Sequence, residues 1–162
     1  MADQPNAKRV LAAQAWRQIF NFVISTVEVR DRVLERLKLT PGDSRVLMSL
    51  NDREGRTMRS LADEWGCDAS TATWMVARLA DRGLAERRAV PNDRRIRLIV
   101  LTPRGTRSKR DLLAKLYAPP APMLRLGRRD LLTLRDATAK LPAGPLPPSP
   151  VSAPPRTASA PR

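Results

Sequence analysis

The sequence predicts a mainly α-helical protein with one small β-hairpin, an α+β fold. Apolar residues recur at three- and four-residue steps through most of the first 141 residues, as they do in amphipathic helices. Two of the shorter helical segments meet at the turn Gly66-Cys67-Asp68. Two extended runs, 84–90 and 96–101, flank the turn-forming stretch 91–95. A length of 162 residues suits one domain, expected over residues 1–141.

Residues 7–38 contain no Gly or Pro and are expected to form one long helix. Its apolar residues fall on two faces, which implies burial against two different bodies. One body is the chain's own core and the other a partner subunit. Trp16 and Phe20 belong to the first face, and Ile19 and Phe22 to the second.

Three short helices are expected next. The breaker 40–43 starts the first, which ends at the polar run 51–55. Thr57 caps the second, which Gly66 closes, and Trp65 is assigned to its core side. Asp68 caps the third, residues 69–82, which Gly83 ends.

The remainder begins with the hairpin, and Thr102-Pro103 then starts a helix that runs to about Tyr117. Residues 118–122 hold three prolines and break it, and 128–141 form the last helix. Residues 142–162 hold eight prolines and no aromatic residue, so we expect a disordered Pro-rich tail.

The charge favours a polyanionic partner. The net charge is +14, with 30 Lys and Arg against 16 Asp and Glu. Residues 78–110 alone hold eleven basic residues and three acidic ones. There is no histidine and a single cysteine, Cys67, which excludes an internal disulfide and most nucleophilic triads. No signal-peptide core or membrane span is visible, so a cytoplasmic protein is expected.

The turn at residues 66–68 indicates a helix-turn-helix, in which the second helix lies in the major groove of DNA. Small polar residues must then stand near the start of that helix, on the side away from the core. Ser70, Thr71, Thr73 and Trp74 occupy such positions, and Arg78, one turn on, suits a phosphate.

The order of elements resembles the MarR family of winged helix-turn-helix transcriptional regulators, over roughly residues 10–141. The stretches that carry the likeness are LTPGDSRVLMSL, SLADEWGCDASTATWMVARLADRGLAERR and PNDRRIRLIVLTPRG. The resemblance implies a winged helix-turn-helix with a helical dimerisation region. Residues 40–102 would be the DNA-binding head, and 7–38 with 103–141 the dimerisation helices.

The resemblance also assigns roles within the hairpin. Arg95 takes the place of the wing arginine that enters the minor groove, Asp93 that of the acid that braces the wing, and Arg94 that of a phosphate contact. Arg97 joins them as a DNA-binding residue. Trp74 departs from the family, since members often have a polar or basic residue there. The family further implies a homodimer on a palindromic operator, repression, and release by a small-molecule effector that the sequence does not name.

Several competing interpretations remain. A sequence-independent architectural DNA-binding protein would share the charge and the fold. An RNA-binding module would need more aromatic residues. No enzyme, cofactor or metal site is expected, because the acids fall on helix starts and exposed faces, Asp43 among them. Cys67 is interpreted as a packed residue of the turn and not a redox sensor. For Trp16, Phe20 and Tyr117, core and dimer packing is favoured over an effector pocket.

Overall fold

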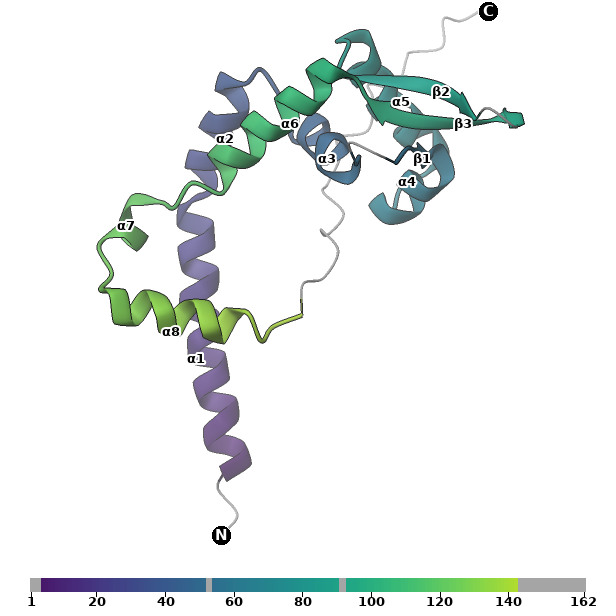
Figure 1. Ribbon diagram of the computed structural model, residues 1–162. Helices are drawn as coiled ribbons and strands as arrows, with labels where there is room; N and C mark the ends of the chain where they lie inside the picture. Colours follow the sequence, from purple (N-terminus) through teal and green to yellow (C-terminus); the bar gives the residue numbers. More distant parts are fainter. Residues whose placement is uncertain (1–3, 52–53, 91–92, 143–162) are drawn as a thin grey trace, which may run out of the picture.

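The computed structural model describes residues 4–51, 54–90 and 93–142, with the side chains of 4–5, 90 and 93–95 excluded. Figure 1 shows a head of short helices and a hairpin, from which one long helix and a C-terminal helical arm extend. The elements are α1 (Gln4–Ser25), α2 (Val27–Arg36), α3 (Pro41–Ser49), β1 (Arg56–Thr57), α4 (Met58–Trp65), α5 (Ala69–Asp81), β2 (Ala85–Val90), β3 (Asp93–Leu101), α6 (Pro103–Leu116), α7 (Ala121–Leu124) and α8 (Arg128–Thr138). The mainly helical α+β prediction is confirmed.

The first helix is interrupted, so the prediction of one helix over 7–38 is wrong in its middle. α1 ends at Ser25 and α2 begins at Val27. Thr26 Oγ1 donates to the carbonyl of Val23 at 2.7 Å, and Ser25 Oγ to that of Phe22 at 2.7 Å. Such hydroxyl contacts compete with the helical backbone bonds and bend a helix.

The predicted helix starts of the head are confirmed. The Thr57 side chain accepts from Ser60 N at 3.1 Å and that of Thr102 from Gly105 N at 3.0 Å. Thr40 forms a capping box with Asp43 at the start of α3. Gly66 and Gly83 adopt φ values of 60° and 66°, a region that glycine enters without steric cost.

The core lies in the head, between helices α3, α4 and α5 and the sheet, and it takes in α2 and α6 at its edge. The three strands are antiparallel in the order β1-β3-β2. β1 was not predicted, because two residues carry no readable alternation. A Cβ on the neighbouring Gly55 would lie 2.6 Å from Leu98 Cβ, so only glycine fits there. The fully buried large side chains include Val46, Leu47, Leu50, Leu61, Trp65, Val76, Leu79, Ile99 and Leu112.

The helices outside the head have little core of their own. None of the described residues of α1, α7 or α8 is buried. Trp16 is 63% exposed and Tyr117 74% exposed, and Phe20 is also exposed. The prediction that these three residues pack in the core of a single chain is therefore wrong. Their packing against a second copy stays a prediction.

Candidate nucleic-acid interface

Helices α4 and α5 form the predicted helix-turn-helix. α4 ends at Trp65 with Gly66 as its C-cap, and Cys67 N donates to Ala62 O at 3.1 Å as the chain turns. α5 then begins after the cap residue Asp68, whose side chain accepts from Thr71 N. The buried residues of α5 are Ala72, Met75, Val76 and Leu79. Their three- and four-residue spacing fixes the opposite face of α5 toward solvent.

Three hydroxyl groups at the exposed start of α5 donate their hydrogen bonds to acceptors within the protein. Ser70 Oγ donates to Asp68 Oδ1, and Thr71 Oγ1 donates to Asp68 Oδ2 at 2.9 Å. Thr73 Oγ1 donates to Ala69 O at 2.7 Å. Hydrogen bonds from Ser70 and Thr71 hold the pKa of Asp68 well below its ordinary value, so the carboxylate stays ionised and can only accept. Each hydroxyl therefore offers lone pairs to solvent.

Trp74 and Arg78 lie one turn apart on the outer side of α5. The Arg78 guanidinium carbon is 5.8 Å from the Trp74 ring centroid, within the range of a cation–π contact. Arg78 Nε also pairs with Asp43 Oδ1 at 3.1 Å. Trp74 remains 38% exposed, so the structure turns it outward.

Asp43 corrects the expectation that the acids of this chain only cap helices or face solvent. Its side chain is 1% exposed and contacts two cations of α5 and its C-cap, Arg78 and Arg82. Arg82 Nη1 lies 2.8 Å from Asp43 Oδ2, and its Nη2 donates to Lys38 O at 2.6 Å. Asp43 also accepts from Thr40 N at 2.8 Å. One carboxylate thus ties α5 to the junction between α2 and α3.

The hairpin is confirmed, but its turn is shorter than predicted. β3 begins at Asp93, so Asp93, Arg94 and Arg95 belong to a strand and not to the turn. Their side chains lie outside the described residues, as do Pro91 and Asn92 entirely. The register shifts between Ala89 and Val90, next to this end of the hairpin.

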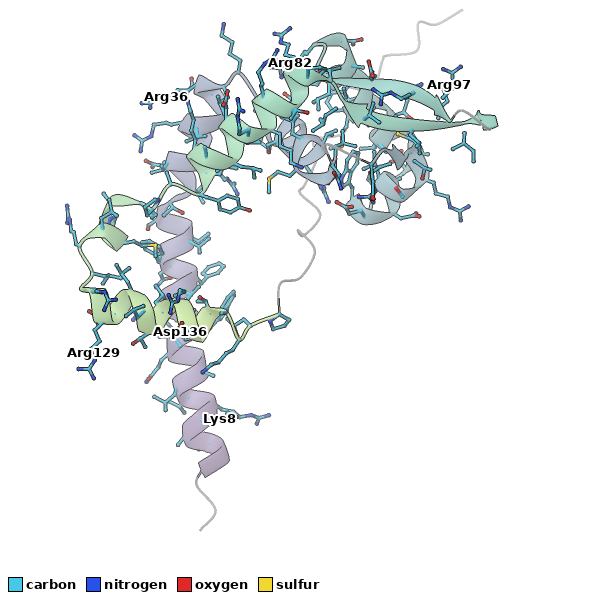
Figure 2. The ribbon with its side chains drawn as sticks, in the orientation of Figure 1. Lys8, Arg36, Arg82, Arg97, Arg129 and Asp136 are labelled. Atoms are coloured by element: carbon cyan, nitrogen blue, oxygen red, sulfur yellow. The ribbon has the colours of Figure 1, made fainter. Side chains whose placement is uncertain are left out.

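Among the hairpin arginines whose side chains the structure describes, three are exposed: Arg87 and Arg88 on β2 and Arg97 on β3. Arg88 Nη2 lies 2.7 Å from Glu86 Oε1. Figure 2 shows Arg97 on the hairpin, at the side of the molecule remote from Lys8 on α1 and Arg129 on α8. The hairpin therefore places positive charge beside the head and away from the helical arms.

Sequence reasoning missed Arg45, which is only 5% exposed although its residue type favours a surface position. Arg45 Nη2 donates to Trp65 O at 3.0 Å, at the end of α4. Within the described part of the chain, its Nε and Nη1 atoms have no hydrogen-bond partner. No periodicity of the sequence distinguishes this arginine from an exposed one.

A polar network beside Arg45 holds α4 against α3. Trp65 Nε1 donates to Ser49 Oγ at 2.9 Å, and Ser49 Oγ donates to Glu64 Oε1 at 2.6 Å. Arg56 Nη1 lies 2.6 Å from Glu64 Oε2. Burial would raise the pKa of Glu64, but the hydrogen bonds from Ser49 and Arg56 lower it overall. The core assignment of Trp65 is confirmed.

The other candidate sites are weaker. Cys67 is partly buried against the core, and burial raises the pKa of its thiol, the opposite of an activated cysteine. An open hollow of about 600 Å³ lies along α6, lined by Thr106, Lys109, Arg110, Leu113, Ala114 and Tyr117.

The described residues contain no cluster of metal-binding side chains. None of their helices is long and apolar enough to cross a membrane.

Comparisons with known proteins agree with this architecture. Residues 37–96 match the sequence model of the MarR family. The YusO protein of Bacillus subtilis has a similar structure, with a TM-score of 0.62 and 27% sequence identity over 86% of this chain and 96% of that one. No curated protein matches the sequence.

Two further solved structures carry ligands. A mutant MepR of S. aureus bound to an oligodeoxyribonucleotide has a TM-score of 0.62 and 18% identity, over 77% of this chain and 94% of its own. CouR of Rhodococcus jostii RHA1, bound to p-coumaroyl-CoA, has a TM-score of 0.55 and 25% identity, over 75% and 86%. The similarity to MepR concerns the fold alone.

Proposed function

We propose that this chain, a member of the MarR family of winged helix-turn-helix transcriptional regulators, binds double-stranded DNA in a sequence-specific manner. Members of this family are regulators and not enzymes. The observation that carries the proposal is the outer face of α5. It presents polar side chains and Trp74 at the start of a helix that the core holds rigidly, beside a hairpin with three exposed arginines.

In the proposed complex, α5 enters the major groove. Ser70, Thr71 and Thr73 face the bases as hydrogen-bond acceptors, because their protons are used within the protein. The donors that bases offer in the major groove are the exocyclic amino groups of adenine and cytosine. We therefore expect those bases opposite the first turn of α5.

The hairpin acts as the wing. By the family's pattern, Arg95 enters the minor groove, Asp93 braces the strand, and Arg94 contacts a phosphate. The described arginines support this orientation, since Arg97 is exposed on β3 beside the same strand end. A narrow A·T-rich minor groove attracts an inserted arginine through its concentrated negative potential.

We also propose that two copies of the chain bind a palindromic operator. The exposed apolar residues outside the head need a cover, and a second copy supplies one: Val10, Leu11, Trp16, Phe20, Val23, Ile24, Val29, Tyr117, Leu124, Leu126 and Leu141. Two heads then contact half-sites about 10 bp apart, centre to centre. Binding over a promoter would repress transcription.

Release by a small-molecule effector completes the proposal. The structurally similar CouR was solved with p-coumaroyl-CoA bound, which supports a small-molecule site in this chain. In this chain the α6 hollow combines Tyr117 with Lys109 and Arg110. An effector shifts the spacing of the two heads only if it binds the two conformations of the dimer unequally.

Selection of bound DNA from a random pool at about 150 mM salt tests the proposal. Enrichment of one palindrome, bound at least about a thousandfold more tightly than random duplex, supports a sequence-specific regulator. Equal binding to all duplexes would instead favour an architectural protein.

A pair of variants tests the orientation. Arg97→Ala should reduce the salt slope of binding by about 1.8 per bound dimer, the loss of one phosphate contact from each copy. Arg129→Ala on α8 removes the same charge from the far side of the molecule and should leave the slope unchanged. Equal effects of the two variants would contradict the placement of DNA on the head.

A further inference from the structure

We propose that Trp74 determines specificity by packing its ring on the 5-methyl group of a thymine in the major groove, with Arg78 holding the ring in place. The inference rests on the proposed DNA binding and deepens it, because it names a chemical group of the operator.

The position of Trp74 on α5 is the first step. Ser70, Trp74 and Arg78 are spaced four residues apart and form one stripe along the outer face of the helix. Among the large apolar side chains described in the head, residues 40–102, only Trp74 and Ile96 are exposed. The neighbour Ala77 is too small to cover an indole ring. Trp74 therefore lies on the outer face of α5, one helical turn after Ser70.

The ring is held from one side. The Arg78 guanidinium lies over it at 5.8 Å, and Arg78 Nε is fixed at 3.1 Å by Asp43, whose side chain is 1% exposed. Asp43 is in turn anchored by Arg82 and the Thr40 amide. Because the ring is already held in place, it loses little conformational entropy when a base covers its other face. The contact then costs less free energy than one made by a mobile side chain.

The chemistry of the major groove then selects the partner. Base edges present hydrogen-bond donors and acceptors there, and the thymine methyl is their apolar group. A ring face that accepts no strong hydrogen bond fits that methyl better than a polar edge. Arg78 lies one helical turn after Trp74, and its side chain is 40% exposed. In the proposed complex this places it near the edge of the major groove, where the phosphates lie.

The test replaces thymine by uracil, which removes only the methyl group, at each position of the selected duplex. With the full chain at about 150 mM salt, one uracil in a single half-site should weaken binding about fourfold, as expected for one buried methyl-sized group. At that position, cytosine should bind weakly and 5-methylcytosine should recover affinity relative to cytosine.

Variants assign the effect to this ring. Trp74→Ala should bind thymine and uracil duplexes equally, whereas Trp74→Phe should still prefer thymine, because it keeps an apolar ring without the indole N–H. Arg78→Lys keeps the charge but not the planar fork, so its thymine preference should fall. The matched control Arg97→Ala should weaken both duplexes alike.

The outcomes separate the two proposals. If no duplex is selected, sequence-specific binding fails and this inference fails with it. If a palindrome is selected but uracil is tolerated at every thymine, or Trp74→Ala keeps the preference, only the role of Trp74 is overturned. A full preference in Arg78→Lys would overturn the role of Arg78.

Discussion

Replacing Asp43 by asparagine should destabilise the protein by about 2–3 kcal/mol. The side chain is 1% exposed and receives Arg78 Nε at 3.1 Å, Arg82 Nη1 at 2.8 Å and Thr40 N at 2.8 Å. Removing one partner of a fully buried ion pair costs roughly 3–5 kcal/mol. The two arginine side chains are 40% and 32% exposed, so water can solvate them after the change and lower that cost.

Urea unfolding at a fixed protein concentration measures the effect, since stability of an oligomer depends on concentration. With an m value of about 1–3 kcal/mol per M, a loss of about 2–3 kcal/mol should lower the midpoint by roughly 0.7–3 M. The control Asp63→Asn changes an exposed acid of α4 and should stay within about 0.5 kcal/mol of the wild type.

A second comparison separates capping from ion pairing. Thr40→Ala removes the side-chain acceptor of the Asp43 amide and should cost about 1 kcal/mol, as for a lost N-cap. If Asp43→Asn costs no more than Thr40→Ala, the carboxylate serves only as a cap, and its proposed hold on α5 is refuted.

Three further outcomes are expected. Gly105→Ala should cost at least about 3 kcal/mol in urea unfolding, because the new Cβ would lie 1.8 Å from the backbone oxygen of Leu84; a smaller loss would mean that α6 shifts freely. Iodoacetamide should label Cys67 much more slowly in the native protein than in urea at neutral pH, since burial raises its pKa; equal rates would revive a reactive thiol. The depressed pKa of Asp68 contributes stability that is fully present above its ordinary value of 3.8 and is lost as the pH falls from there toward the depressed folded-state value. The advantage of the wild type over Asp68→Ala, measured by urea midpoints, should therefore begin to shrink below about pH 5 and should still be shrinking at about pH 3; an advantage independent of pH would contradict this role of the carboxylate.

Features set within a few residues could be predicted from the sequence. The caps Thr57, Asp68 and Thr102 each satisfy a backbone amide three residues ahead, so residue type and spacing reveal them. The break at Thr26 could not be predicted, because threonine is also compatible with an unbroken helix and only its contact with Val23 O distinguishes the two. Strand β1 exists only through its pairing with β3, and its closest register pair, Thr57 with Leu98, joins residues 41 positions apart in the sequence.

In the candidate site, too, the local features could be predicted and the contacts between distant residues could not. The sequence places Ser70, Thr71 and Thr73 on the outer face of α5, but the direction of their hydrogen bonds follows from side-chain rotamers. The sequence predicts Asp43 as part of a helix start, and that is confirmed. Its arginine partners, however, lie 35 and 39 residues further along the chain, so no local pattern indicates them. A local pattern cannot express a contact that the fold creates.

The three tryptophans show where sequence reasoning reaches its limit. Trp65 is 1% exposed, Trp74 38% and Trp16 63%, although each is an apolar residue on a predicted helix. The core of the head covers Trp65, and helix periodicity alone predicts that. Trp74 lies outside the buried set of α5, and there its ring contacts Arg78, which pairs with Asp43. Trp16 contacts Phe20 with ring centroids 5.9 Å apart, on a helix without buried residues among those described. An aromatic pair on such a helix gains burial only from another surface, so the two exposed tryptophans are the residues by which DNA binding and dimerisation can each be tested separately.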